Sequence, residues 1–463
     1  MTDQRSDLLS LADIERCFGG AIPAVLATAS GDGVPNVTYI SRAHRVDDQR
    51  IALSNQFMSK TALNLIANPR ASLLLVDPLT HDEYRLALVY ERTERRGHVF
   101  ERLSADIEAL AALEGMEGVY RLRAADVFRV VEIVEEPPNP TGALPDELPA
   151  ARVAGVEPLG LAELARVVSR TGDLDVLVET ALDVLDRRLG YAHTALLLLD
   201  EAGQRLYNIA SHGFDTQGIG AEVVVGEGPI GLVAARCEPL RIGSLLQSVK
   251  YSGAIRRRYA DAGVRPGREV PLPVVPGVQS RIVVPAMVAG QLVAVLVAES
   301  RRPAAFGESD ETVLGVAAAL VAGGIEAVRT VVDQPGDGET DTPARQAVAA
   351  SRSVAGTTSI RFFAVDASVF VDGEYLIKGV AGRILWSLLR QYTDEGRVDF
   401  TNRELRLDPT LELPGFKDNL ESRLILLKRR LDERDVPLRI EKTGRGRFRL
   451  DVATPLRLDV VDA

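Results

Sequence analysis

A short run of hydroxyl and lysine side chains, Ser59-Lys60-Thr61, lies where a predicted strand gives way to a predicted helix. Backbone N–H groups at a helix start attract anions, and a neighbouring lysine adds a positive charge. These residues therefore predict a phosphate-binding loop. The alternative from the same residues is that Ser59 caps the helix and Lys60 is a solvated surface charge.

Basic side chains near the C-terminal end form a second group with binding chemistry. A predicted helix carries Arg423, Lys428 and Arg429, and a glycine-bearing hairpin after it carries Arg445 and Arg447. Such cations contact the phosphates and base edges of DNA. The same helix holds side chains that weaken phosphate contacts. They are Ile425, Leu426, Asp418, Glu421, Asp432 and Glu433. The residues alone leave both DNA binding and protein docking open.

Residues for covalent or metal chemistry are scarce. The five histidines are scattered, and neither His193 nor His212 has a partner at metal-ligand spacing. Cys237, at a predicted helix-to-strand turn, is a candidate redox sensor, although a lone cysteine in such a turn is more often structural. No P-loop and no Ser/His/Asp or Cys/His constellation is present in the sequence. The sequence therefore predicts binding and names no catalytic residue.

Composition places the chain among cytoplasmic proteins. Two cysteines, Cys17 and Cys237, fit a reducing compartment. The polar, amphipathic start is no signal peptide, and no apolar run is long enough to span a membrane. The net charge is −11, but residues 357–463 carry 19 Lys and Arg against 18 Asp and Glu, a net of +1, which leaves −12 for the rest. Only the C-terminal part therefore keeps DNA binding open.

Two linker-like stretches divide the 463 residues into three parts. The first is rich in proline and alanine, and the second is longer, polar and glycine-bearing. We predict a β domain over residues 1–135, a linker over 136–158, an α+β domain over 159–332, a linker over 333–358 and a helix-turn-helix domain over 359–463.

The first part alternates short strands with turn signals, a pattern typical of a small barrel. The run from ATASGDG through SNQFMSKTALNLIANPRASLLLV resembles the pyridoxamine-phosphate-oxidase-like, FMN-binding split barrels. That resemblance implies a homodimer with FMN at the subunit interface and Ser59, Lys60 and Thr61 on its phosphate. It also implies five residues along the ring system: Tyr39, Ile40, Ser41, Ser54 and Asn55. Relatives of this fold also bind haem or a deazaflavin, which remain alternatives.

The middle part predicts helices over one side of an antiparallel sheet. Its first amphipathic helix has Asp173 as N-cap and Gly190 as its stop, and two hairpins follow, TALLLLD–RLYNIAS and IVVPAMVAGQLVAVLVAES. Together with GEGPIGLVAA, these features resemble a GAF domain. The resemblance implies an unidentified small-molecule ligand, in a pocket lined by RIGSLLQSVKY.

The third part predicts, in order, a hairpin, a helix, a short helix, a long helix and a glycine-bearing hairpin. LLKRRL followed by IEKTGRGRFRLDV resembles the winged helix-turn-helix of OmpR-like transcription factors. The resemblance implies that the long helix enters the major groove and that the hairpin contacts phosphates. Ile425 and Leu426 depart from the polar or basic residues common there.

The three resemblances together imply a one-component sensor and transcriptional regulator. The alternative is an FMN-dependent oxidoreductase whose other domains regulate it, so the sequence leaves enzymatic activity open. Pyridoxamine phosphate oxidation itself is not expected, because that oxidase has a tryptophan-containing segment after the barrel and the only tryptophan here is Trp386.

Overall fold

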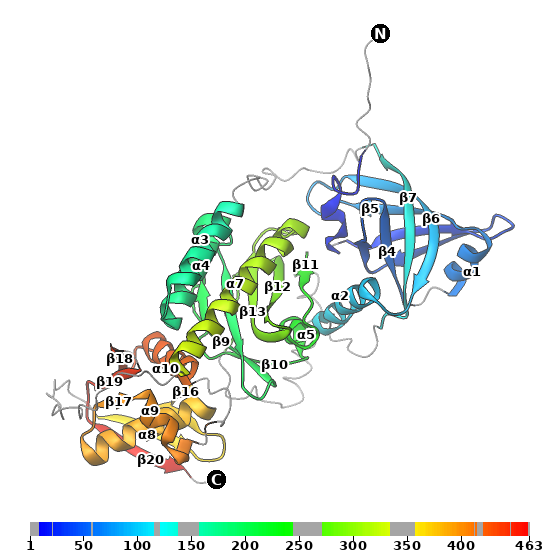
Figure 1. Cartoon of the computed structure of the whole chain (residues 1–463). Coiled ribbons are helices and arrows are strands. Elements are labelled where there is room, and N and C mark those ends of the chain that lie inside the picture. The colour runs from blue at the N-terminus through cyan, green and yellow to red at the C-terminus, as the bar shows by residue number, and fades with distance from the viewer. Residues whose placement is uncertain are drawn as a thin grey trace.

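The computed structural model describes residues 9–20, 22–56, 59–114, 121–137, 157–243, 271–333, 357–411, 413, 420–444 and 446–461. We call residues 9–137 the first unit, 157–333 the middle unit and 357–461 the third unit. Figure 1 shows the middle unit between the other two. Most of both predicted linkers lies outside these ranges.

The first unit is a β half-barrel. Its described strands form one antiparallel sheet in the order β2-β1-β5-β6-β7-β4-β3, and β2 contacts β4. Apolar side chains from alternate strand positions, such as Leu26, Leu73 and Phe128, fill its core. Its elements are η1 (Glu15–Gly19), β1 (Ala24–Ala29), β2 (Pro35–Ile40), β3 (Ala43–Arg45), β4 (Arg50–Asn55), α1 (Ser59–Ala67), β5 (Arg70–Val76), β6 (Glu83–Glu94), α2 (His98–Glu114) and β7 (Ala124–Glu135).

The middle unit is a sheet with helices on both faces, so the prediction of helices over one side only is wrong: α3, α4 and α7 pack on one face and α5 on the other. The described strands are antiparallel in the order β10-β9-β8-β13-β12-β11. Its elements are α3 (Glu157–Arg170), α4 (Leu174–Leu189), β8 (Thr194–Leu199), β9 (Arg205–His212), β10 (Glu222–Val224), α5 (Gly228–Arg236), β11 (Leu240–Ile242), β12 (Ser280–Val288), β13 (Gln291–Ser300) and α7 (Glu308–Asp333).

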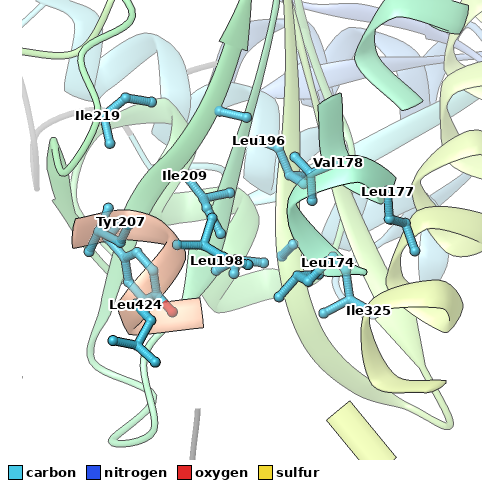
Figure 2. Close-up of a cluster of buried hydrophobic side chains, with 14 of the residues drawn as sticks. Leu174, Leu177, Val178, Leu196, Leu198, Tyr207, Ile209, Ile219, Ile325 and Leu424 are labelled. Carbon is cyan, nitrogen blue, oxygen red and sulfur yellow. The ribbon is translucent and has the colours of Figure 1, made fainter. Parts of the chain in front are cut away.

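Alternation along β8 divides the core of the middle unit in two. Leu196 and Leu198 pack with α3, α4 and α7, whereas Ala195 and Leu197 pack with α5 on the opposite face. Figure 2 shows the first of these clusters, with Leu177 and Val178 of α4 and Ile325 of α7. The predicted hairpins are confirmed as β8–β9 and β12–β13.

Both predicted boundaries of helix α4 are confirmed. Asp173 accepts hydrogen bonds from the N–H groups of Asp175 and Val176, and Gly190 ends the helix with a φ of 73°. That φ lies in the left-handed region, which glycine adopts without strain.

Helix α7 is the one helix in the described ranges that is long and apolar enough to cross a membrane. Of its most apolar window, 44% is buried within the chain. Leu314, Ala318 and Ile325 lie in the core of the middle unit, and Val168 and Leu177 pack closely over Gly324. We therefore describe α7 as the core helix of this unit.

The third unit contains two small sheets and three helices in its described part. One sheet has the order β16-β15-β14-β20 and the other β17-β19-β18. The elements are β14 (Thr358–Phe363), β15 (Ser368–Val371), β16 (Glu374–Ile377), α8 (Gly379–Glu395), β17 (Asp399–Thr401), α9 (Asn402–Leu407), η2 (Pro409–Leu411), α10 (Leu420–Glu433), β18 (Leu438–Gly444), β19 (Arg447–Val452) and β20 (Leu456–Val461). The predicted hairpins and helices appear in the predicted order.

Candidate functional site

The predicted phosphate-binding loop lies at the start of α1, which hydrogen bonds tie to two strands. Asn36 Nδ2 on β2 donates to Thr61 Oγ1 at 3.0 Å, and Asn64 Nδ2 donates to Thr28 Oγ1 on β1 at 3.1 Å. Thr61, Asn64 and Thr28 are buried. The Thr61 hydroxyl therefore positions the helix as well as lying at its start.

Two side chains beside this helix start are open to a ligand. Lys60 is exposed. Gln56 Nε2, just after β4, is buried and has no hydrogen-bond partner in the described part of the chain. A buried donor without a partner is costly, so an acceptor from a bound molecule would stabilise it. The side chain of Ser59 lies outside the described residues. Sequence reasoning missed Gln56, although it follows the predicted Ser54-Asn55 pair directly.

The predicted ring-contacting residues come from two segments that the structure joins. Ser54 N–H donates to the Arg42 carbonyl at 2.9 Å, and Arg42 N–H donates to Ser54 Oγ at 3.1 Å. This brings the end of β2 beside the end of β4. Asn55 Nδ2 is held by Asp126 Oδ2 at 2.8 Å. Ser54 and Asn55 therefore have partners within the chain.

The three other predicted ring-contacting residues differ in exposure. Ile40 is buried in the core, Ser41 is half-buried and Tyr39 is 79% exposed. Tyr39 is one of five large apolar side chains on β2, α1 and the turn before β2 that are exposed in the described part of the chain. They are Val34, Val37, Tyr39, Leu63 and Ile66. Exposed apolar side chains that lie together mark a binding face.

The α5 side of the middle unit carries a polar pair within an apolar surface. Glu299 on β13 is buried, accepts from Arg281 Nε at 2.8 Å and accepts from the Val275 N–H at 2.9 Å. Cys237 ends α5 with a φ of 55°, and burial raises the pKa of its thiol. A protonated thiol is a poor nucleophile, which favours the structural role for Cys237. Most of the predicted pocket segment RIGSLLQSVKY lies outside the described residues.

The histidines of the middle unit have ordinary partners. His212 Nε2 lies 3.0 Å from Asp186 Oδ2, and the His193 ring meets Phe214 edge-on. Among the residues that the structure describes, no group of His, Cys, Asp and Glu side chains could hold a metal ion.

A cavity of about 560 Å³ opens on the third unit beside Trp386, which stacks on Phe362. Its rim carries Arg383 and Arg390 as well as Asp394. Mixed charges of this kind select neither an anion nor a cation.

Charged side chains join the first unit to the middle unit. Arg102 on α2 makes two hydrogen bonds to the Glu311 carboxylate on α7, at 2.8 and 2.7 Å, and its side chain is only 7% exposed. Arg241 on β11 lies 3.0 Å from the same carboxylate. Arg45 pairs with Glu308 at 3.2 Å. Although burial alone would raise the pKa of Glu311, Arg102 and Arg241 lower it, so this carboxylate stays ionised.

The third unit contacts the middle unit through α10, where Arg423 is central. Its guanidinium pairs with Glu201 at 2.6 Å and lies 4.3 Å from the centre of the Tyr207 ring. Both partners of the ion pair are largely covered, at 13% and 12% side-chain exposure. A cation over an aromatic face gains further attraction. Figure 2 shows Tyr207 beside Leu424 of α10.

The other basic side chains of α10 and β18 also meet carboxylates of the middle unit. Arg429 Nε and Lys428 Nζ contact the two oxygens of Asp175, at 2.6 and 2.7 Å. Lys442 Nζ on β18 contacts Asp173 at 2.5 Å. Burial alone would raise the pKa of Asp175, but Arg429 and Lys428 lower it.

Four side chains of α10, spaced four, three and four residues apart, contact the middle unit: Ser422, Leu426, Arg429 and Glu433. Ser422 accepts a hydrogen bond from Arg329 of α7 at 3.2 Å. Leu426 is buried and packs against Gly220, whose added Cβ would lie 3.9 Å from Leu426 Cδ1. Glu433 accepts from the N–H groups of Gly218 and Ile219, at 2.7 and 3.2 Å. Because these residues share one helix face with Arg429, α10 presents a continuous surface to the middle unit.

The structure thus places three of the predicted DNA-contacting residues, Arg423, Lys428 and Arg429, against middle-unit carboxylates. Two of the six residues that depart from a DNA-binding pattern, Leu426 and Glu433, belong to this contact. Arg447 lies exposed on β19, and Arg445 falls outside the described residues. Lys442, which precedes the glycine-bearing turn, was not among the predicted DNA-contacting residues.

Two family models match the chain. Residues 12–133 match the model described as pyridoxamine 5′-phosphate oxidase, and residues 171–326 match the GAF domain model. No curated protein matches the chain.

Several solved structures are similar to parts of the chain. An FMN-binding protein from Syntrophomonas wolfei subsp. wolfei is 18% identical over 27% of this chain and 85% of its own, with a TM-score of 0.23. The GAF domain of an Acinetobacter phosphoenolpyruvate-protein phosphotransferase is 21% identical over 39% of this chain and 98% of its own, with a TM-score of 0.31. Free methionine-R-sulfoxide reductase from Neisseria meningitidis is 21% identical over 40% of this chain and 97% of its own, with a TM-score of 0.31. From the two family models, the chain joins an N-terminal domain of the pyridoxamine-phosphate-oxidase type to a GAF domain.

Proposed function

We propose that the protein is a cytoplasmic sensor that regulates transcription. In this proposal the N-terminal domain binds FMN, the GAF domain binds a small molecule, and the third unit is a winged helix that binds DNA. Both cysteines are free, as expected in a reducing compartment.

Helix α7 carries this proposal, because it contacts both neighbouring units. Its first turn holds Glu308 and Glu311, which pair with arginines of the first unit. Near its other end, Arg329 donates to Ser422 of α10 in the third unit. A helix of 26 residues is about 39 Å long. One rigid element therefore links the N-terminal domain to α10, and a ligand in either sensor domain can bias it.

The side chains beside α1 fit a phosphate-bearing cofactor with a flat ring. Exposed Lys60 and the N–H groups at the α1 start suit the phosphate, and the Gln56 amide, which has no partner among the described residues, suits a ring carbonyl. The exposed Tyr39 offers an apolar surface to the ring. When bound, a flavin would supply one- or two-electron redox chemistry, which suits a redox sensor.

The exposed apolar side chains of the first unit support a homodimer. Val37 and Tyr39 project from the edge strand β2, and Leu63 and Ile66 project from α1, each more than 60% exposed. A second copy of the chain would cover these side chains and enclose the Lys60 region between two subunits.

The order of elements in the third unit supports a winged helix. Helices α8, α9 and α10 precede the β18–β19 hairpin, which pairs with the short β17. In this arrangement α10 takes the place of the helix that enters the major groove.

The visible absorption spectrum of purified protein tests the flavin part of the proposal. We expect two flavin bands, with FMN released on heating. Lys60→Ala should weaken FMN binding, whereas Arg85→Ala, which removes an exposed charge from β6, should not. A colourless protein that takes up no added FMN would refute the flavin assignment. Sustained NAD(P)H oxidation would favour an FMN-dependent oxidoreductase.

A further inference from the structure

Three carboxylates of the GAF domain bind four cations of the third unit. The carboxylates belong to Asp173, Asp175 and Glu201, and the cations to Arg423, Lys428, Arg429 and Lys442. An arginine or lysine side chain recognises a phosphate through the same hydrogen bonds that it gives to a carboxylate.

From this we infer that double-stranded DNA and the GAF domain compete for one surface of the third unit, and that the structure shows the closed state in which the GAF domain holds it. The surface consists of the four cations just named, with Lys442 extending it from α10 onto the β18–β19 hairpin. The inference rests on the proposed function, because it takes DNA as the ligand of the third unit.

The contact excludes DNA from the centre of this surface. Arg423 is enclosed between Glu201 and the Tyr207 ring, and Leu426 beside it is buried. Arg429 also donates to the carbonyl groups of Ile209 and Asp175, so its guanidinium is fully engaged by the GAF domain. A phosphate reaches these groups only after α10 leaves the GAF domain.

The edge of the same surface stays accessible. The side chains of Lys428 and Lys442 are 39% and 48% exposed. DNA phosphates can therefore approach these two lysines first. Because both units belong to one chain, the closed contact forms at high effective concentration, and a modest intrinsic affinity keeps it populated. Weakening the contact on the GAF side should thus expose the surface without altering it.

The test is DNA binding by the full chain after three GAF carboxylates are neutralised. The variant D173N/D175N/E201Q changes no residue of the third unit, and asparagine at 173 keeps the α4 cap. A matched control, E163Q/E179Q/D183N, changes the net charge equally on α3 and α4 outside the contact with α10. Fluorescence anisotropy with a labelled duplex, at several salt concentrations, gives the affinity. Small-angle X-ray scattering reports release of the third unit without DNA.

We expect the variant to bind DNA about ten- to a hundredfold more tightly than the wild type, because the binding-competent fraction rises. The dependence of affinity on salt should also steepen, as up to about four phosphates are newly contacted. The radius of gyration should increase in the variant. The control should match the wild type in both measurements.

Three results would overturn the inference, and they are distinguishable. If the variant expands but binds DNA no better than the control, DNA is not the ligand, and the proposed output fails with it. If the wild type already binds DNA as tightly as the variant, the masking is refuted while the proposed function stands. If the charge-reversed variant D175K/E201K also stays compact, these carboxylates do not hold α10.

Discussion

The two contacts of the GAF domain differ in the residues at their centres, which are charged in one and apolar in the other. Its contact with the N-terminal domain consists mainly of charges, with Arg102, Arg241 and Glu311 at the centre and Ala109 of α2 as its buried apolar member. Its contact with the third unit has an apolar centre that includes Leu426, and ion pairs surround it. The first should therefore respond mainly to charge and pH, and the second both to charge and to the loss of packing.

Because of this difference, we expect the two contacts to differ in how easily they open. Buried ion pairs need nearly ideal geometry to repay their desolvation, so they fix one orientation of the two domains. An apolar contact ringed by ion pairs tolerates opening more easily, because its charges find water or phosphate once released. We therefore expect the first contact to act as a fixed joint and the second to open.

Among the substitutions that test this comparison, Arg102→Ala should cause the largest loss in the free energy of unfolding. The substitution removes one of the two arginines that contact the Glu311 carboxylate. Arg241 then remains to neutralise its charge. Loss of one partner of a buried pair costs about 3–5 kcal/mol. Denaturant unfolding of the full chain should show this loss in the transition of the first two units.

Arg187→Ala is the matched control for Arg102→Ala. Arg187 pairs with Asp183 one turn away on α4, and both side chains are exposed. An exposed pair of this kind contributes less than about 1 kcal/mol. Equal losses in the two variants would show that the joint is not held by its buried charges.

Leu426→Ala should weaken the second contact by about 2–3 kcal/mol, since it removes buried methyl groups from the apolar centre. Hydrogen exchange in β9 and α4, which α10 contacts, should then become faster. Leu407→Ala on α9 is the control, because Leu407 is 73% exposed. Unchanged exchange in the Leu426 variant would mean that charges alone hold α10.

Local patterns predicted much of the fold. The N-cap Asp173, the stop at Gly190 and the hairpins of the middle unit follow from residue types within a few positions. The strand β6 was missed, although it lies at the centre of the first sheet, because Arg85, Glu91 and Arg92 interrupt its apolar alternation. Its buried Leu86 and Leu88 show that burial in the sheet overrides that composition.

The contacts between units could not be predicted in this way. Arg423 and Glu201 are 222 residues apart, and neither position carries a local pattern that names the other. The sequence did mark Ile425, Leu426 and Glu433 as unsuited to DNA contacts. The GAF domain contacts Leu426 and Glu433, which explains the presence of these two residues in the helix. The two residues that do not fit the DNA-binding motif therefore indicate that the same face of α10 has a second partner.

The first unit should also lose stability in mild acid, through His44 on β3, which lies near Arg241 and Glu311 of the middle unit. Burial lowers the pKa of His44 to about 4, and Arg102 and Arg241 act in the same direction, while Asp106 and Glu311 oppose it. The folded pKa lies below the unfolded value of about 6.5, so the unfolded chain takes up the proton first. The stabilisation is therefore complete above pH 6.5 and is lost as the pH falls toward 4. Between pH 7 and pH 5 the loss is about 2 kcal/mol.

Denaturant unfolding at a series of pH values measures this loss, with His44→Gln as the comparison. The variant should show a flatter dependence between pH 7 and pH 5, because glutamine carries no proton to exchange. A variant as steep as the wild type would assign the acid sensitivity to other groups. Leu426→Ala should leave this pH dependence unchanged, since His44 lies at the other contact. If both substitutions flattened it, the two contacts would be coupled, and α7 would transmit charge changes at one joint to the other.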